Sequence, residues 1–140
     1  MRIFIDDERM PAKGGKPWTI IRSWKEWIEF SEVLKTSKRK ELPNHVSFDH
    51  DLGDTMFNMT GLDIAKDMIE LDMDEELTFP KDFTWVVHSQ NPVGAENIKM
   101  LLKGYFDFKK KGQGEVYKKI YKYIEANKYE LIQAANNGGY

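Results

Sequence analysis

Short apolar runs alternate along this chain with longer segments in which apolar residues recur every three or four positions. The runs are rich in β-branched and aromatic residues and predict strands at residues 2–5, 18–21, 45–48 and 83–87. The longer segments have the spacing of amphipathic helices and predict helices at 24–35, at 61–73, from Pro92 onward and at about 115–134. Strands that alternate with helices form mostly parallel sheets covered by those helices. The pattern therefore predicts an α/β fold with a mostly parallel sheet of about four strands.

Capping residues mark where three of these helices begin. Ser23 precedes the first helix, and Thr60 precedes the second with Asp63 three positions later, which is the spacing of a capping box. Asn91 followed by Pro92 has the residue types preferred at a helix cap and in its first turn. Each helix is therefore expected to start shortly after a polar loop.

Three of the predicted strands end in ionisable residues rather than in turn residues. Asp6 and Asp7 follow the first strand, and Asp49 and Asp51 follow the third. In open parallel sheets the ligand site lies at the carboxyl ends of the strands, so these acids should converge if their strands are neighbours. Crowded carboxylates raise one another's pKa values, and a hard divalent cation relieves that repulsion. The pattern predicts a Mg²⁺ or Mn²⁺ site, with helix caps or surface charges as the alternative.

Two of the three histidines are expected at the same edge of the sheet. His50 follows the third strand and His88 follows the fourth, whereas His45 lies at the other end of its strand and is expected on the surface. Histidine titrates near neutral pH and commonly acts as a general acid or base. One histidine could take a proton from water and the other could protonate a leaving ribose oxygen, in an order that the sequence leaves open. The alternative is that each makes a structural hydrogen bond.

Residues at the starts of two helices are candidates for phosphate binding. Ser89 and Asn91 lie just before the helix that begins at Pro92, and Thr60 lies just before the second helix. Unpaired N–H groups and the helix dipole attract anions at such positions. Capping is needed in either case, so the open question is whether phosphate binds there as well.

Composition and charge exclude several classes of protein. The chain has 140 residues, which suits one domain, and no cysteine, which excludes a disulfide scaffold, an iron–sulfur cluster and a thiol nucleophile and fits a cytoplasmic protein. No apolar run is long enough to cross a membrane. Residues 49–82 carry 11 acidic and 2 basic residues, whereas residues 99–128 carry 9 lysines and 3 acidic residues. The acidic block could hold a cation and the basic block could face an anion, or both are solvated helix faces.

Five motifs follow one another in the first three quarters of the chain: MRIFIDDERMP, WTIIRS, SFDHDLG, TGLD and VVHSQNPVG. They resemble the cyclic-phosphate-processing receiver domain, a divergent relative of the response-regulator receiver fold found in bacteria and their phages. The resemblance covers roughly residues 1–102. It implies a receiver-like (flavodoxin-like) fold. We expect a receiver-like domain at residues 1–108 and, outside the resemblance, a C-terminal helical extension at residues 109–140 that packs on the same domain.

The resemblance also implies roles for several residues. Receiver domains hold Mg²⁺ with an acidic pair after the first strand, which Asp6 and Asp7 match, and phosphorylate an aspartate after the third strand, which Asp49 matches. Ser89 is the nearest match to the hydroxyl residue that holds the phosphoryl group. Receiver domains also need a lysine after a fifth strand, and the sequence contains neither in that context. This departure argues against an ordinary phosphorelay, and the two added histidines favour hydrolysis.

The expected function is that of a metal-dependent phosphoesterase that opens a cyclic phosphate on a nucleotide or an RNA end. The candidate catalytic residues are His50, His88, Asp49 and Asp51, where Asp51 orients a histidine or joins the metal ligands. One alternative is a receiver-like module without enzymatic activity that binds Mg²⁺ in its acidic pocket. Others are a haloacid-dehalogenase-like phosphatase, with Asp49 as nucleophile and Asp51 as acid and base, and a protein that sequesters nucleotides. The lysines of the C-terminal helix could attract RNA or a protein partner.

Overall fold

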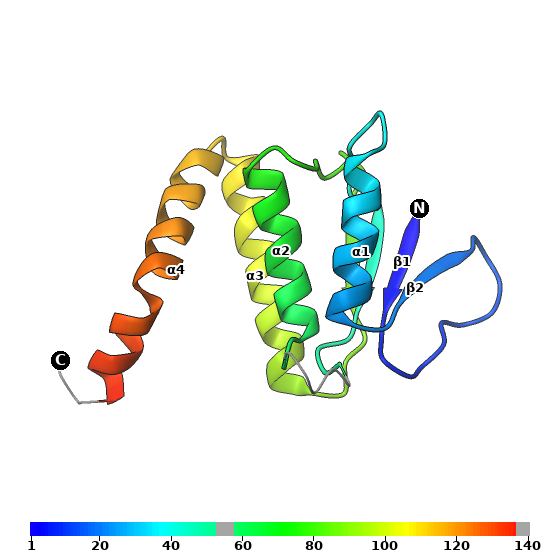
Figure 1. Ribbon diagram of the computed structural model, residues 1–140, viewed down its shortest axis with the longest axis horizontal. Helices are drawn as coiled ribbons and strands as arrows, with labels where there is room; N and C mark the ends of the chain where they lie inside the picture. Colours follow the sequence, from blue (N-terminus) through cyan, green and yellow to red (C-terminus); the bar gives the residue numbers. More distant parts are fainter. Residues whose placement is uncertain (53–57, 137–140) are drawn as a thin grey trace. The chain divides into compact units, whose positions relative to one another are not determined.

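A single parallel sheet organises the computed structural model, which describes residues 1–52 and 58–136. The elements are, in chain order, β1 (Arg2–Ile5), β2 (Trp18–Ile21), α1 (Trp24–Lys35), β3 (His45–Phe48), α2 (Gly61–Met73), β4 (Thr84–Val87), α3 (Pro92–Lys110) and α4 (Gly114–Asn136) (Figure 1). The strands lie in the order β2-β1-β3-β4, and every neighbouring pair is parallel. The predicted α/β, flavodoxin-like class is confirmed.

The predicted helix starts are confirmed by their caps. The Ser23 hydroxyl accepts a hydrogen bond from the Glu26 N–H at 3.2 Å, and α1 begins at the next residue. At the start of α2, the Asp63 carboxylate accepts a hydrogen bond from the Thr60 N–H at 2.8 Å. These caps satisfy backbone N–H groups that have no partner within the helix.

The fourth strand is one residue shorter than predicted. Phe83 is outside the sheet because its N–H donates to the carbonyl of Pro80 in a turn, at 3.1 Å. Its ring packs against Phe79, with 4.5 Å between the ring centroids. The aromatic side chain that suggested a strand residue therefore packs in the turn that precedes β4.

The register of the sheet aligns the ends of β1, β3 and β4. Ile5 lies opposite Phe48 in the parallel ladder. The Asp49 N–H donates to the Ile5 carbonyl and the His88 N–H donates to the Phe48 carbonyl, both at 2.9 Å, so the ladder continues one residue beyond the strands. As a result, Asp6, Asp49 and His88 leave the sheet at the same edge.

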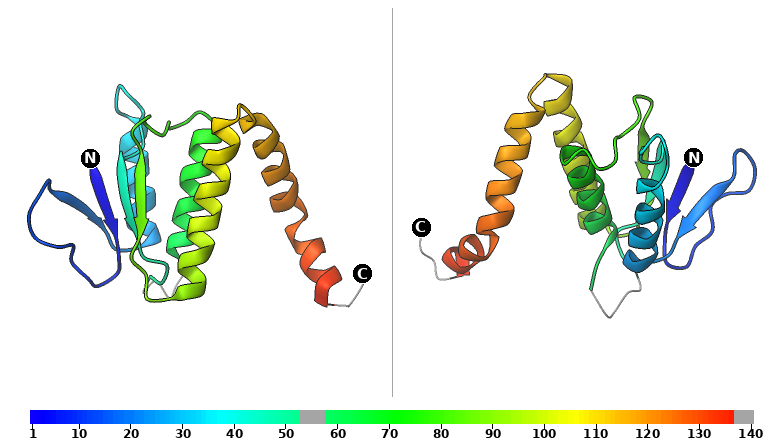
Figure 2. Two further views of the ribbon diagram at one scale, coloured as in Figure 1. Left: turned by 180° about the vertical axis from the view of Figure 1, so that it is seen from behind. Right: turned by 45° about the horizontal axis from the view of Figure 1, so that its top comes forward.

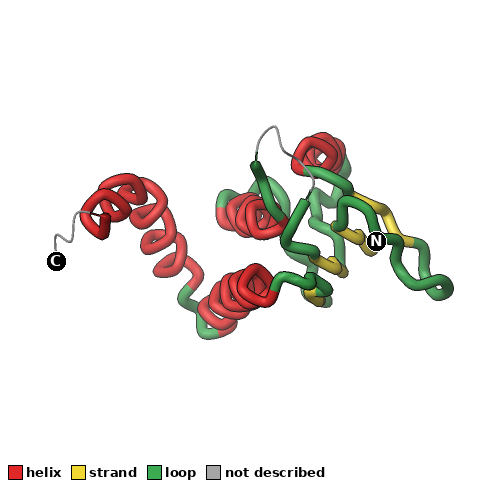
Figure 3. The backbone as a smooth tube through the Cα atoms, turned by 90° about the horizontal axis from the view of Figure 1, so that it is seen from below, coloured by secondary structure: helices red, strands yellow, loops and turns green. Residues whose placement is uncertain are grey.

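One face of the sheet forms the core of the first part of the chain. Its fully buried side chains include Ile3, Ile5, Val46 and Phe48. The helices α1 and α2 lie on the same side of the sheet (Figures 2 and 3). They are joined by a hydrogen bond of 2.7 Å from the Trp27 indole N–H to the Asp67 carboxylate. This packing covers one face of the sheet behind the edge where the acids emerge.

The chain divides into two compact units, Met1–Lys103 and Gly104–Tyr140. In the second unit, the Tyr117 ring contacts the rings of Tyr105, Phe108 and Tyr121 at centroid distances of 5.1, 5.4 and 6.1 Å. The boundary expected at residue 108 and the packing of the extension on the first domain stay predictions. Within the described ranges, no helix combines the length and the apolar character needed to span a membrane.

Candidate active site

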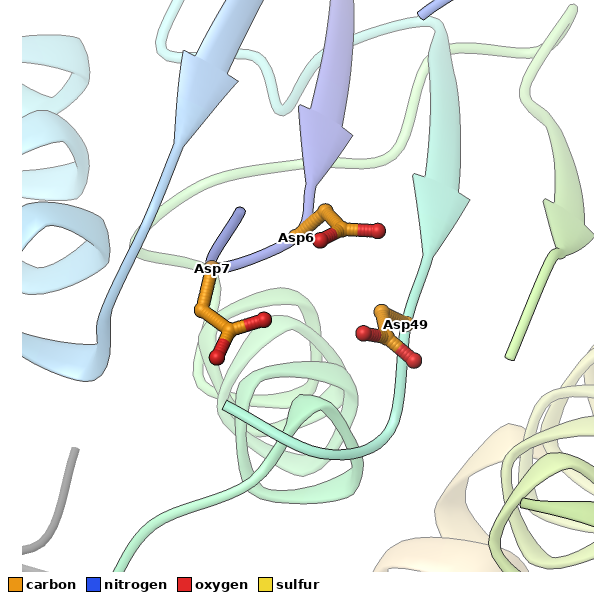
Figure 4. Close-up of side chains that lie close together, drawn as sticks. All are labelled: Asp6, Asp7 and Asp49. Atoms are coloured by element: carbon orange, nitrogen blue, oxygen red, sulfur yellow. The ribbon is translucent and has the colours of Figure 1, made fainter. Parts of the chain in front are cut away.

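Three carboxylates meet at the carboxyl edge of the sheet. Asp6 and Asp7 follow β1 and Asp49 follows β3, and an oxygen from each lies within 4.8 Å of the others (Figure 4). Asp6 is fully buried and Asp49 is 5% exposed, while Asp7 is the most exposed of the three. We refer to these three residues as the carboxylate cluster. Its members are the three residues that the sequence singled out as metal ligands.

Asp6 is held in place by several donors. Its Oδ1 accepts hydrogen bonds from the N–H groups of Glu8, at 3.0 Å, and Arg9, at 2.9 Å. Its Oδ2 lies 3.0 Å from Nε2 of His88. Burial alone would raise the pKa of Asp6, but the two N–H groups, the His88 bond and the Arg9 charge together outweigh it and lower that pKa. Asp6 is therefore an anion at neutral pH despite its burial.

The guanidinium of Arg9 bridges two members of the carboxylate cluster. Its Nε lies 2.9 Å from Oδ2 of Asp6, and its Nη2 lies 3.4 Å from Oδ2 of Asp49. Arg22 supports the same loop, since its Nη1 donates to the carbonyls of Asp6, at 2.9 Å, and Arg9, at 2.6 Å. Sequence reasoning assigned neither arginine a role. The only signals were the position of Arg9 directly after the acidic run and the presence of Arg22 in a motif.

His88 has partners at both ring nitrogens. Its Nδ1 lies 2.7 Å from the hydroxyl of Ser47, and its Nε2 contacts Asp6 as described. Its ring is stacked on Phe4 with 4.5 Å between the centroids and an interplanar angle of 8°. Ser47 was not among the expected site residues, although a serine inside an otherwise apolar strand was a signal. This packing orients His88 towards the carboxylate cluster.

His50 belongs to a separate hydrogen-bonded group. Its Nδ1 lies 2.8 Å from Oδ1 of Asp51, and the side-chain amide of Asn91 donates to both oxygens of Asp51, at 3.2 and 3.4 Å. The bond from His50 and then those from Asn91 lower the pKa of Asp51, against a smaller opposing effect of burial. Asp51 is exposed and is not a member of the carboxylate cluster, because it turns back towards His50. Three of the four expected acids therefore converge.

Two glycines let α2 and α3 start against this segment. A Cβ atom on Gly61 would lie 1.8 Å from the Asp49 carbonyl oxygen, and a Cβ atom on Gly94 would lie 2.3 Å from Cγ of His50. The Gly61 N–H also donates to the His50 carbonyl at 2.7 Å. Only glycine allows backbones and rings to approach so closely. Both helices therefore fix the position of Asp49 and His50.

The three residues expected to bind phosphate all have capping or turn roles. The N–H and hydroxyl of Thr60 donate to Asp63, at 2.8 and 3.1 Å. The Ser89 hydroxyl accepts a hydrogen bond from the Asn91 N–H at 3.1 Å, and the Asn91 side-chain oxygen accepts one from the Gly94 N–H at 2.9 Å. Phosphate binding by these residues stays a prediction.

Comparison with known protein families matches residues 1–104 to the family described as the cyclic-phosphate processing receiver domain. The chain belongs to this family. No match is found among the curated proteins, and none among the solved structures. The motifs that suggested the family fall at the edge described above, except that Gly53, the last residue of SFDHDLG, lies outside the described residues. The match is to receiver domains, so it gives the haloacid-dehalogenase alternative no support.

This cyclic-phosphate processing receiver domain differs from the receiver pattern in its charges. In the described residues the sheet has four strands and no fifth. The lysine that receiver domains carry after a fifth strand therefore has no counterpart in these residues. The positive charge next to Asp49 comes instead from Arg9. The oxygen donors of Asp6, Asp7 and Asp49 are those that Mg²⁺ and Mn²⁺ prefer, and a guanidinium cation already lies against two of them. The donor set therefore fits a hard divalent cation.

Proposed function

We propose that this protein is a metal-dependent phosphoesterase that opens a cyclic phosphate on a nucleotide or an RNA end. The observation that carries the proposal is the carboxylate cluster, which lies at the ligand-binding edge of a domain whose family processes cyclic phosphates. Asp6, Asp7 and Asp49 would hold Mg²⁺ or Mn²⁺. Such an ion neutralises charge on the phosphate and lowers the pKa of a bound water.

Hydrolysis of a cyclic phosphate needs one proton to be removed and one to be supplied. Water attacks phosphorus and loses a proton, one bond from phosphorus to a ribose oxygen breaks, and that oxygen gains a proton. His50 is suited to carry a proton because Asp51 orients its Nδ1. Its Nε2 has no hydrogen-bond partner among the residues that the structure describes. The ring is also held against Gly94, which limits its movement.

His88 is better suited to positioning than to proton transfer. Both of its ring nitrogens are engaged, by Ser47 and by Asp6, and its ring is stacked on Phe4. A histidine with these contacts orients a carboxylate for metal binding, as neighbouring hydrogen bonds do around many metal ligands. The sequence led us to expect that both histidines exchange protons with the substrate. We now propose that role for His50 alone.

Phosphorus NMR of 2′,3′-cyclic AMP, with Mg²⁺ or Mn²⁺ present, tests the proposal directly. The wild-type protein is expected to convert the cyclic signal to one monophosphate isomer, because a single ester bond is protonated on leaving. The Asp49→Asn and His50→Gln variants are each expected to lower the rate by about 10²-fold or more, the usual effect of removing an acid, base or charge-stabilising group. The Asp82→Asn variant is a control because Asp82 is exposed and outside the carboxylate cluster.

The variants also separate the two histidine roles. His88→Gln is expected to weaken Mn²⁺ binding, measured by electron paramagnetic resonance, whereas His50→Gln is expected to leave it unchanged. Full activity of Asp49→Asn would refute the metal role of that residue. If the cyclic substrate binds and broadens its line without conversion, the protein is a binding or signalling module and the enzymatic proposal fails.

A further inference from the structure

We propose that the Arg9 side chain occupies the cation site of the carboxylate cluster until the metal binds, and that the displaced guanidinium then binds the phosphate of the substrate. The inference rests on the proposed function, since it concerns the same metal and the same phosphate. It assigns Arg9 a substrate-binding role that follows from its contacts and its exposure.

The guanidinium competes with a metal for the same oxygens. It lies 2.9 Å from Oδ2 of Asp6 and 3.4 Å from Oδ2 of Asp49, and both carboxylates belong to the cluster. A divalent ion bound by these residues would be within a few ångströms of a second positive charge. Like charges at that distance repel strongly where burial limits solvent screening. The Arg9 side chain must therefore leave these oxygens when the metal arrives.

The backbone of Arg9 can stay in place while its side chain moves. The Arg9 N–H donates to Oδ1 of Asp6 at 2.9 Å, and the Arg9 carbonyl accepts a hydrogen bond from Nη1 of Arg22 at 2.6 Å. The Arg9 side chain is 40% exposed, so it has access to solvent, whereas the Asp6 side chain is fully buried. Displacement therefore requires new side-chain torsions only and leaves the loop intact.

The displaced guanidinium is tethered at the rim of the metal site. A planar guanidinium pairs with two phosphate oxygens at once and is more weakly hydrated than an ammonium group. A cyclic phosphate bound next to the metal presents such oxygens, and charge on them grows as water attacks. Arg22 is not available for this contact, because its guanidinium is bound to two carbonyls and to the sulfur of Met10. Of the two guanidinium groups at this loop, that of Arg9 is therefore the one that can move to the phosphate.

Two binding measurements on the full chain test this proposal. The Arg9→Gln variant is expected to bind Mn²⁺ about fivefold to tenfold more tightly than wild type in paramagnetic resonance titrations. The reason is that the metal no longer has to break the two partly exposed ion pairs of Arg9 with Asp6 and Asp49. In calorimetric titrations of Mg²⁺-saturated protein with inorganic phosphate, the same variant is expected to bind about tenfold more weakly. Arg39→Gln is the matched control, because Arg39 is exposed and is not near the carboxylate cluster.

The outcomes distinguish this inference from the proposed function. Mn²⁺ binding by Arg9→Gln that is equal to or weaker than that of wild type would overturn the displacement. Phosphate binding by Arg9→Gln that is unchanged from wild type would overturn the phosphate contact. In both cases, Mn²⁺ binding by the wild type would leave the proposed function standing. If neither protein binds Mn²⁺, both proposals fail.

Should Arg9→Gln not fold, the wild type provides the test. The chain has four arginines, so their Nε–H groups can be followed by NMR after assignment, and Mg²⁺ is expected to shift the signal of Arg9 most. An unshifted Arg9 signal in metal-saturated protein would overturn the inference.

Discussion

The carboxylate of Asp6 is fully buried, and its oxygens face two backbone N–H groups, an imidazole and a guanidinium. A buried anion is costly unless its oxygens accept hydrogen bonds, and here every partner favours the ionised form. The pKa of Asp6 is lowered, so its contribution to stability is present above pH 3.8 and is lost as the pH falls through the folded-state pKa. The ionised form is also the form that binds a metal.

Asp67 shows the opposite behaviour. Burial raises its pKa, against the opposing effects of the Trp27 hydrogen bond and the Lys35 charge. Folding therefore favours the protonated form, and the protein loses stability as the pH rises from 3.8 through the folded-state pKa. The Asp67→Asn variant keeps an oxygen acceptor for the Trp27 N–H and removes the buried charge. We expect its melting temperature to exceed that of wild type at neutral pH.

The decisive measurement is how the difference in melting temperature between wild type and Asp67→Asn changes with pH. Well below pH 3.8 both side chains are neutral in the folded and the unfolded protein, so wild type and Asp67→Asn should melt at nearly the same temperature. Thermal unfolding of both proteins followed by circular dichroism across this pH range would show it. A difference that does not change with pH would contradict the electrostatic explanation and indicate altered packing between α1 and α2.

At the scale of elements, the starts of α2 and α3 position the segment that follows β3. Gly61 contacts the backbone of Asp49, and Gly94 contacts the ring of His50. The cap of α3 also contributes to the site, because Asn91 accepts a bond from the Gly94 N–H and donates to Asp51. Parallel sheets bring helix starts and strand ends together. One residue such as Asn91 can therefore cap a helix and also contact a group of the candidate site.

Two glycines of α3 provide a matched pair of variants. A Cβ on Gly94 would lie 2.3 Å from the His50 ring, whereas a Cβ on Gly104 would meet nothing within 4 Å. We expect Gly94→Ala to lower the free energy of unfolding by about 1–3 kcal/mol because the ring must move. Gly104→Ala is expected to raise it by about 0.5–1 kcal/mol because alanine favours the helix. Urea denaturation measures both, and a Gly94→Ala variant as stable as wild type would show that His50 shifts without strain.

At the scale of the whole molecule, the family match and the first compact unit cover nearly the same residues. The match covers residues 1–104, and the first unit is Met1–Lys103. Every member of the carboxylate cluster, together with Arg9 and His88, lies in that unit. The lysine-rich residues beyond it have their own aromatic contacts around Tyr117. The residues to which we assign this chemistry therefore all lie in the first unit.

Truncation after Lys110 tests whether the first unit is sufficient for metal binding. The shortened chain is expected to unfold cooperatively and to bind Mn²⁺ with an affinity within about twofold of the full chain, because every member of the carboxylate cluster lies in the first unit and sites without shared partners contribute almost additively. Its melting temperature is expected to fall modestly, since Tyr105 loses its contact with Tyr117. Thermal unfolding and Mn²⁺ titration check both points. Loss of Mn²⁺ binding in a folded truncated chain would show that the extension takes part in the site.

The sequence by itself determined the elements, their caps and which strands end in acids. These features depend on residues within a few positions of one another, so periodicity and capping motifs reveal them. Ser23, Thr60 and Asn91 are examples, since each caps the helix that its neighbours predicted. The α/β class follows from the order of these elements, and the motifs were specific enough to identify the family.

Only the tertiary structure decided how the candidate residues combine. His88 and Asp6 are 82 positions apart and lie 3.0 Å from each other, a contact that depends on strand order and register. The same order brings Asp49 beside Asp6, while Asp51, only two residues further on, turns to His50 instead. Arg9 is only three positions from Asp6, but its contact with Asp49 could not be predicted because that contact depends on which strands are neighbours. Local pattern carries no information about that arrangement.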